Sequence, residues 1–226
     1  MTQGSIARLL LAFAIPLMLG NLFQQLYNTV DSLIVGNFVG KQALAAVGCT
    51  GPIINTLIGL FGGLAAGASV VVSQYYGAKD WERLGKAVHT TVMLTLAACL
   101  VLTVVGVWAT PLMLRLMDTP SDVIQKAAVY LQIYFGGISG LLLYNIGSGI
   151  LRAVGDSTRP LYFLIFSALM NTGLDLLFVA VLRLGIAGAA IATILSQFIS
   201  AVLVMLLLLG SKEPYRLRLN QLKITP

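Results

Sequence analysis

Residues 160–182 read PLYFLIFSALMNTGLDLLFVAVL, an apolar run that contains one carboxylate, Asp175. A helix needs about 20 mostly apolar residues to cross a bilayer, so this run is predicted to span a membrane. A carboxylate in hydrocarbon is costly unless it faces water or a partner, and such residues are rarely present without a use. Asp31 occupies the same kind of position in the first apolar run of the chain. The two acids favour a transporter over a simple membrane anchor.

The composition of the whole chain agrees with a membrane environment. Of 226 residues, 58% are hydrophobic and 10% are charged, with a mean hydropathy of +0.92. Soluble domains carry about 25% charged residues. The net charge of +6 is dispersed over short loops without interleaved aromatic residues, so no nucleic-acid partner is expected. Cys49 and Cys99 lie in apolar runs and are interpreted as core residues, not as a disulfide or a metal pair.

The chain contains six apolar runs that are long enough to cross a bilayer, and none shows the alternating pattern of an outer-membrane barrel. The first run lacks a cleavage site and is expected to be retained as a helix. The predicted fold class is an all-α membrane protein, a six-helix transmembrane bundle over residues 1–210 with a cytoplasmic linker or tail at 211–226. The predicted spans are about 10–38, 44–75, 87–108, 123–151, 160–182 and 186–209.

The orientation follows from the excess of Lys and Arg in cytoplasmic loops. With the N-terminus inside, ten basic residues fall on the cytoplasmic side and four on the other, so both termini are expected to be cytoplasmic. The ten are Arg8, Lys79, Arg83, Lys86, Arg152, Arg159, Lys212, Arg216, Arg218 and Lys223, and the four are Lys41, Arg115, Lys126 and Arg183.

Glycines recur at four-residue intervals in two of the runs. Gly59, Gly63 and Gly67 lie along the second run, and Gly136 and Gly140 lie along the fourth. Small residues at this spacing let helix backbones approach closely in lipid. The repeats therefore predict a compact bundle and do not indicate a substrate.

Several polar side chains are predicted to share one depth in the bilayer. Counting 1.5 Å per residue along each span places Asp31 and Asp175 in the outer half. Thr193 and Tyr130 fall in the same half, whereas Gln24 and Asn171 lie a turn or two closer to the midplane. Asn171 and Asp175 are four residues apart and share a helix face. These positions describe one candidate site.

The chemistry of this candidate site favours cations. Burial and mutual repulsion both oppose ionisation of two neighbouring carboxylates, so at least one is expected to hold a proton. A proton, a sodium ion with oxygens from Asn171 and Thr193, or a cationic substrate would each discharge the pair. No Arg or Lys is expected inside the membrane to offset the acids. Two alternatives stay open: Asp31 is interfacial if the first span ends at Val30, and Asp175 makes a structural hydrogen bond.

Other polar segments have simpler interpretations. His89 is expected at the cytoplasmic interface, with a role in proton relay as the alternative. Residues 152–159 are interpreted as a cytoplasmic turn in which Gly155 allows the exit from one helix and Asp156 or Ser157 caps the next. No nucleophile–base pair, phosphate loop or metal-ligand cluster is recognisable in the loops, so an enzyme is not expected.

Six ordered motifs make the chain resemble the multidrug and toxic compound extrusion (MATE) family, most closely its DinF-like branch. They are Ile15-Pro16-Leu17, Tyr27-Asn28-Thr29-Val30-Asp31, Gln74-Tyr75-Tyr76-Gly77-Ala78, the run from Arg152 to Pro160, Asn171-Thr172-Gly173-Leu174-Asp175 and Gly188-Ala189-Ala190-Ile191-Ala192-Thr193. The resemblance covers the whole chain.

The resemblance implies two six-helix lobes around a cleft that opens alternately to each side, of which this chain is similar to the N-terminal lobe. It implies a cation-coupling site, for H⁺ or Na⁺, at Asp31, Asn171, Asp175 and Thr193, with Gln24 and Tyr130 lining the cavity. Pro16 stands where the first helix of the family bends. The chain departs from the family where Leu176 replaces a frequent proline, which leaves the backbone of the fifth span in question.

The expected function is cation-coupled antiport that exports cationic amphiphilic drugs or metabolites across a prokaryotic inner membrane. No cofactor is expected beyond the coupling ion. The expected partners are a small cationic organic substrate, the lipid bilayer and a second lobe, either in cis if the chain is a fragment or as a second copy. The alternatives are a lipid-linked glycan flippase, which would need basic residues in its cleft, and a half-length scaffold that does not transport.

Overall fold

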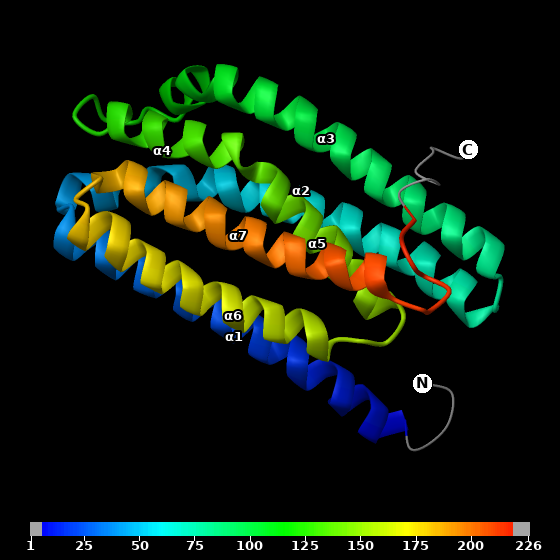
Figure 1. The fold of residues 1–226 in the computed structure, drawn as a ribbon. Helices are drawn as coiled ribbons and strands as arrows, with labels where there is room; N and C mark the ends of the chain where they lie inside the picture. The colour runs from blue at the N-terminus through cyan, green and yellow to red at the C-terminus, as the bar shows by residue number, and fades with distance from the viewer. Residues whose placement is uncertain (1–5, 219–226) are drawn as a thin grey trace.

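The computed structural model describes residues 6–218 of the chain, with side chains from residue 10 onward. Nearly all of this range is helical (Figure 1). The helices are α1 (Ile6–Phe38), α2 (Lys41–Gly77), α3 (Trp81–Leu116), α4 (Ile124–Gly136), α5 (Ile138–Ala153), α6 (Thr158–Asp175), the π-helical turn η1 (Leu176–Val181) and α7 (Gly185–Gly210).

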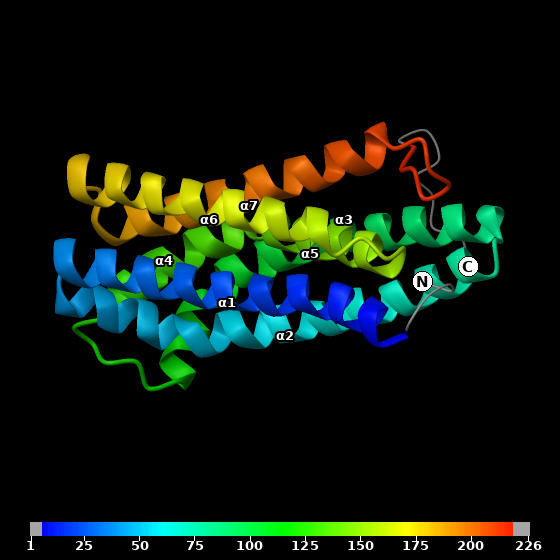
Figure 2. The same ribbon diagram turned by 90° about the horizontal axis from the view of Figure 1, so that it is seen from below.

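The helices confirm the six-helix membrane bundle. Five are long and apolar enough to cross a bilayer, α6 and η1 counting as one, and the bent pair of α4 and α5 makes a sixth span. The long axes of the helices run in broadly the same direction (Figures 1 and 2). An even number of spans returns the chain to the side where it began, so α1 starts and α7 ends at the same end of the bundle (Figure 1). This end is called the inner end below.

Neighbours along the chain are not always neighbours in space. The first helix, α1, packs against α6, and α7 packs against both α6 and α5 (Figure 1). On the other side of the bundle, α2 packs against α5, and α3 packs against α4 (Figure 1). The pairing of α1 with α6 matters most for the site, because it brings the two predicted acids together.

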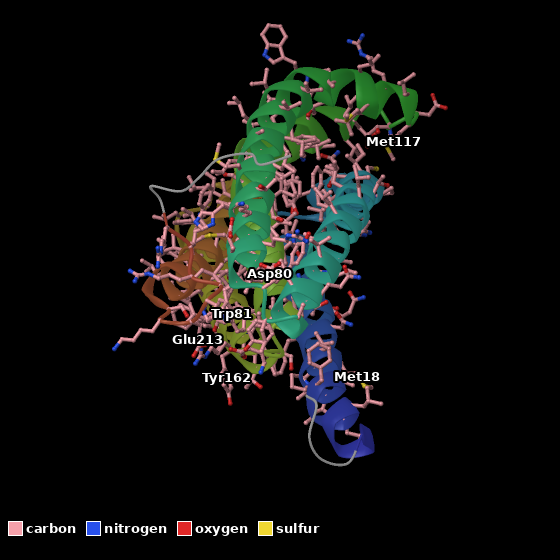
Figure 3. The ribbon with its side chains drawn as sticks, turned by 90° about the vertical axis from the view of Figure 1, so that its right-hand side faces the viewer. Met18, Asp80, Trp81, Met117, Tyr162 and Glu213 are labelled. Atoms are coloured by element: carbon pink, nitrogen blue, oxygen red, sulfur yellow. The ribbon has the colours of Figure 1, made fainter. Side chains whose placement is uncertain are left out.

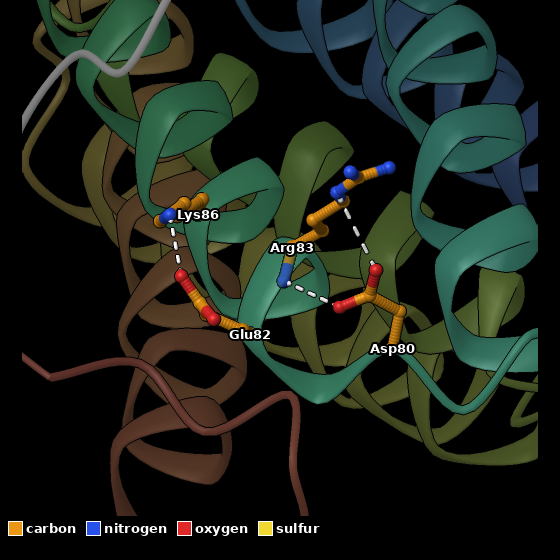
Figure 4. A network of polar contacts seen from close by, with 4 residues as sticks. All are labelled: Asp80, Glu82, Arg83 and Lys86. Carbon is orange, nitrogen blue, oxygen red and sulfur yellow. Dashed lines mark hydrogen bonds and ion pairs between the residues drawn. The ribbon is translucent and has the colours of Figure 1, made fainter.

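The third predicted span is the one that differs most in length from the helix that contains it. The sequence predicts a helix over 87–108, whereas α3 runs from Trp81 to Leu116. At its start, the Asp80 carboxylate accepts a hydrogen bond from the Arg83 backbone N–H at 3.1 Å, and Lys86 Nζ lies 2.6 Å from a Glu82 oxygen (Figure 4). An N-cap and an ion pair one turn apart stabilise a helix end in water. Hydropathy detects only the apolar part of such a helix.

The predicted span at 123–151 is broken in two. The axes of α4 and α5 differ by 49°, and Gly137 lies between them. Adjacent glycines are a recognised cause of sharp kinks, and Gly136 and Gly137 stand at the bend. A Cβ atom on Gly137 would lie 2.5 Å from the Cβ of Ile194, so α7 packs directly against the bend. Glycine at position 137 is therefore required at the bend, because any side chain there would clash with α7.

The fifth span remains helical beyond Asp175 but changes its hydrogen-bonding pattern. Residues 176–181 form a π-helical turn, in which the Leu182 N–H donates to the Leu177 carbonyl at 2.8 Å, five residues back. Single π turns in α-helices are frequent at functional sites. The absence of proline at Leu176 thus leaves a continuous helix whose side chains change register directly after the acid.

The glycine repeats have different surroundings. A Cβ on Gly140 would lie 2.9 Å from the backbone nitrogen of Phe198, so the predicted close approach occurs there. Gly59, Gly63 and Gly67 on α2 have no described atom within 4 Å of an added Cβ. The expectation that the glycine repeat on α2 packs against another helix of the bundle is therefore wrong for the described residues. These three glycines leave a smooth, uncovered strip on α2.

The exterior of the bundle is apolar, and the interior contains two apolar clusters. Met18 on α1 and Tyr162 on α6 are 70% and 63% exposed and project outward (Figure 3). One cluster surrounds Phe135 in the outer half, and the other surrounds Leu84 toward the inner end. A protein embedded in lipid presents such an apolar exterior. Cys49 and Cys99 are both free.

Candidate functional site

Asp31 on α1 and Asp175 at the end of α6 meet inside the bundle. Their carboxyl groups lie within hydrogen-bonding reach of each other. Asp31 is 6% exposed and Asp175 is fully buried. Because α1 and α6 pack side by side, the two acids that the sequence placed at one depth also face each other. The alternative of an interfacial Asp31 assumed that the first span ends at Val30, whereas the apolar helix α1 continues to Phe38.

The acid pair has almost no other polar partner. Neither carboxylate oxygen of Asp175, nor Oδ1 of Asp31, has a hydrogen-bond partner in the described part of the chain. Two carboxylates in contact and out of water cannot both carry a charge without a compensating group. Apart from Asp31, no described residue offers Asp175 a structural hydrogen bond. The geometry suits a shared proton or a small cation between the acids.

Asn171 lies one turn before Asp175 on α6 and is equally isolated. Its side chain is 1% exposed, and neither its amide nitrogen nor its amide oxygen has a described hydrogen-bond partner. Each buried polar atom left unpaired costs about 1–3 kcal/mol. An amide oxygen in this position can ligate a cation, and the amide nitrogen can donate to a carboxylate.

Thr193 on α7 joins the acids to a group of tyrosines. Its hydroxyl donates to the Ala189 carbonyl at 3.0 Å, and it lies close to the hydroxyls of Tyr27 and Tyr130. The Tyr130 ring stacks on Tyr134, with centroids 6.4 Å apart and planes 19° apart. The result is an aromatic wall, formed by Tyr27, Tyr130 and Tyr134, directly beside Asp31.

Three residues around Thr193 are not among the site residues that the sequence predicts. Tyr27 lies four residues before Asp31, Tyr134 lies four after Tyr130, and Gln197 lies four after Thr193. Tyr134 lies close to the Gln197 side chain. Residues four apart on a helix share a face, so this spacing from each predicted site residue was the available signal.

A cavity of about 1040 Å³ opens beside the acid pair. Five of the predicted residues lie in its wall, namely Pro16, Gln24, Asp31, Tyr130 and Thr193. Asn171 and Asp175 are not in the lining and lie buried behind it. Asp31 is thus the acid that the cavity reaches, and Asp175 is its buried partner. The α1 helix runs unbroken through Pro16, and its role as a hinge stays a prediction.

The other end of this cavity contains a basic residue, Arg152, which the sequence did not predict to line the cavity. Arg152 lies in the cavity wall with Tyr144, Asn145 and Ser157. The sequence predicts a cytoplasmic turn at this position, outside the spans. The reason is that α5 stays helical through Ala153, so its last turn faces the start of α6. The Tyr144 hydroxyl donates to the Pro160 carbonyl at 3.0 Å and joins the two helices there.

His89 is buried and fully bonded near the start of α3, and its expected position at the cytoplasmic interface stays a prediction. Its side chain is 4% exposed, Nδ1 lies 2.6 Å from the Gly85 carbonyl, and Nε2 accepts from the Arg218 backbone N–H at 2.9 Å. These bonds connect α3 to the segment after α7. His89 is absent from the cavity lining, which argues against a relay to the acid pair.

The oxygen groups around the acids resemble a site for a hard monovalent cation. Across the described residues, no three His, Cys, Asp or Glu side chains gather as a transition-metal site would require. The carboxylates, the Asn171 amide and the Thr193 hydroxyl offer only oxygen ligands, as sodium prefers. A sodium site at these four residues remains a prediction.

Comparisons with known proteins agree on one family. The MatE family model matches residues 16–177. The chain is 40% identical over 199 residues to the probable multidrug resistance protein YpnP of Bacillus subtilis, a match that covers 88% of this chain and 45% of that protein. It is 28% identical to human multidrug and toxin extrusion protein 1, over 91% of this chain and 36% of that protein.

Solved structures give the same result. A MOP superfamily transporter from Pyrococcus furiosus superposes with a TM-score of 0.89 at 28% identity, over 97% of this chain and 49% of that one. An outward-facing MATE family transporter superposes with a TM-score of 0.88, over 98% of this chain and 49% of that one. The chain thus spans about half the length of the relatives that it matches.

Proposed function

The chain belongs to the MatE family, and from this membership we propose that it is the cation-coupling lobe of an antiporter. Driven by H⁺ or Na⁺, the assembled transporter would export small organic cations of amphiphilic character. The observation that carries the proposal is the contact between Asp31, which lies in the wall of a large cavity, and Asp175, which is buried behind it.

The acid pair supplies a physical basis for exchange. With a proton or sodium ion bound, the pair is discharged and has little attraction for a second cation. When the ion leaves, the buried negative charge is costly until another cation approaches Asp31 from the cavity. Coupling ion and organic cation then compete for the same charge, which is the basis of antiport.

The cavity wall suits an aromatic or amphiphilic cation. Tyr27, Tyr130 and Tyr134 lie near Asp31, and a cation over an aromatic face is stabilised by about 0.5–2 kcal/mol. Gln24 adds an amide that can orient a polar group. An apolar cavity with a few convergent polar groups is the usual form of a small-molecule site.

Transport also needs a second unit, because alternating access arises when two repeats rock about a central site. We expect this unit to be a second lobe in the same polypeptide or a second copy of the chain. The uncovered strip of Gly59, Gly63 and Gly67 on α2 is a surface on which another helix could pack closely.

The proposed location is a prokaryotic inner membrane with both termini in the cytoplasm. Among residues with described side chains, eight Lys and Arg lie at or near the inner end and four at the outer end. The positive-inside rule assigns the more basic end to the cytoplasm. Of the other two predicted basic residues, the Arg8 side chain and Lys223 lie outside the described set.

A lipid-linked glycan flippase is the second candidate, and Arg152 is the observation that favours it. Sequence reasoning discounted a flippase because the cleft contained no basic residue, and Arg152 now lies in the cavity wall. The acid pair and the aromatic wall, which a lipid pyrophosphate does not need, still favour export of cations.

Efflux measurements test the proposal. The chain is expressed in its natural reading frame in cells loaded with ethidium, and efflux is driven by an imposed H⁺ or Na⁺ gradient. Asp31→Asn and Asp175→Asn, alone and together, are expected to reduce gradient-driven efflux to the level of cells without the protein. Asp118→Asn, at an exposed acid outside the cavity, is the matched control and is expected to retain full activity. Normal coupled efflux in the double variant would contradict cation coupling and favour a scaffold or a flippase.

A further inference from the structure

The inner end of the cavity differs in charge from the end that contains Asp31. We propose that this inner end is a binding site for the phosphate group of an amphiphile, with Arg152 as its cationic partner. The inference concerns a different end of the cavity from the acid pair. It does not depend on cation coupling.

Arg152 has no carboxylate partner in the described structure. The three ion pairs found among residues 10–218 do not include it. The nearest acid along the chain, Asp156, is already engaged, because it accepts from the Arg159 backbone N–H at 3.1 Å and lies 3.3 Å from Arg159 Nε. An arginine that is partly buried in a membrane protein without an anion is costly, and such residues usually mark a binding site.

The groups around Arg152 are hydrogen-bond donors. The Asn145 amide uses one N–H for the Leu141 carbonyl at 2.9 Å and keeps a second N–H for another acceptor. Ser157 is 5% exposed and contributes a hydroxyl to the cavity wall. Guanidinium presents five N–H donors in a planar fork that matches two phosphate oxygens. The Arg152 guanidinium, the Asn145 amide and the Ser157 hydroxyl together therefore offer N–H and O–H donors that no described acceptor occupies.

The position of Arg152 indicates an amphiphile. It lies in the last turn of α5, at the inner end of a predicted span, and headgroups of a bilayer are expected near the end of a spanning helix. The wall from there toward the midplane includes the apolar side chains of Leu17, Leu161 and Leu164. A ligand with a phosphate at its end and an acyl chain above would contact both. A membrane phospholipid has this form, and a soluble phosphate ester is the other source of the same group.

The two charged ends of the cavity act independently. Tyr130, beside Asp31, and Arg152 are 22 residues apart along α4 and α5, which corresponds to about 30 Å of helix. The Debye length at physiological salt is about 8 Å, although screening is weaker inside the protein. Arg152 therefore does not neutralise the acid pair, and loss of one site should leave the other intact.

Native mass spectrometry of the delipidated full chain tests the inference. The protein is titrated with phosphatidylglycerol, with diacylglycerol that has the same acyl chains but no phosphate, and with glycerol 3-phosphate. Binding of phosphatidylglycerol is expected to be at least about tenfold tighter than binding of diacylglycerol, since a charge-assisted bidentate contact is lost. This comparison uses the unaltered protein and does not depend on the folding of a variant. Equal affinity for the two lipids would overturn the proposal.

Variants assign the effect to Arg152. Arg152→Gln is expected to weaken phosphatidylglycerol binding about tenfold, with Arg152→Lys between it and the native chain. Arg159→Gln, at a neighbouring arginine outside this cavity, is the control and is expected to change affinity less than about twofold. Equal effects of Arg152→Gln and Arg159→Gln would contradict the assignment.

Two further arms separate the sources and the two proposed sites. If glycerol 3-phosphate displaces the lipid at equal concentration, the phosphate site stands and its ligand is soluble; if it does not, the ligand is a lipid. Asp31→Asn is expected to leave phosphatidylglycerol affinity unchanged, so failure of cation coupling and failure of this inference would give different results.

Discussion

Asp175 and His89 are both buried ionisable residues in spanning helices, yet their surroundings are opposite. Both His89 nitrogens have backbone partners, at 2.6 Å and 2.9 Å, whereas neither oxygen of Asp175 has a described hydrogen-bond partner. A buried polar group that is fully bonded contributes to the fold. A buried group left without partners lowers stability and persists where a ligand or proton completes it. The comparison indicates a structural role for His89 and supports the functional role proposed for Asp175.

The largest effect is expected for Asp175→Asn, and it should appear in function and not in stability. We expect gradient-driven efflux to fall to background while the free energy of unfolding changes by less than about 1 kcal/mol, because no described donor is lost. Efflux assays and thermal unfolding of the purified protein measure the two quantities. Loss of stability as large as that of a His89 variant would erase the distinction between the two residues.

The next effect is expected for His89→Ala, and it should appear in stability. The Arg218 N–H loses its acceptor, which costs about 1–3 kcal/mol, and hydrogen exchange at Arg218 should become faster. His89→Gln, which retains an acceptor of similar reach, is the matched control and should recover part of the loss. Coupled efflux in either variant should follow the amount of folded protein. A selective loss of coupling at full stability would restore His89 as a proton relay.

Asn171→Leu sharpens the comparison by removing both unpaired amide atoms. A leucine of similar volume should increase the free energy of unfolding by about 1–2 kcal/mol, since two buried polar atoms no longer lack partners. The same change should weaken Na⁺ protection against thermal unfolding, because an oxygen ligand is lost. Asn145→Leu, at a cavity asparagine away from the acid pair, serves as the control for Na⁺. Destabilisation by Asn171→Leu would mean that the amide has a partner in the folded protein.

The smallest effect is expected for Tyr27→Phe. The variant loses the hydroxyl that lies close to Thr193 but keeps the ring in the aromatic wall. One neutral hydrogen bond contributes about 0.5–1.5 kcal/mol, so ion affinity should change by no more than about tenfold. Isothermal titration of the coupling ion measures the change. Complete loss of ion binding would show that Tyr27 contacts the ion directly, in place of positioning Thr193.

The candidate site was partly readable from single helices. Asp31, Thr193 and Asn171 were found because a polar residue within an apolar run stands out by composition alone. Tyr27 and Gln197 do not stand out in the sequence, since a single tyrosine or glutamine in a spanning helix gains meaning only from the site residue four positions away. Arg152 was placed in a turn because sequence reasoning ended α5 too early.

The sequence by itself determined the number, order and approximate extent of the spans and the depth of the acids. These are local properties, since apolar length and a rise of 1.5 Å per residue do not depend on the neighbouring helices. Only the tertiary structure decided that α1 packs against α6, that α4 and α5 bend at Gly137, and that Arg152 and Asp31 line one cavity. These features depend on which helix faces meet, and residues far apart in the chain decide that.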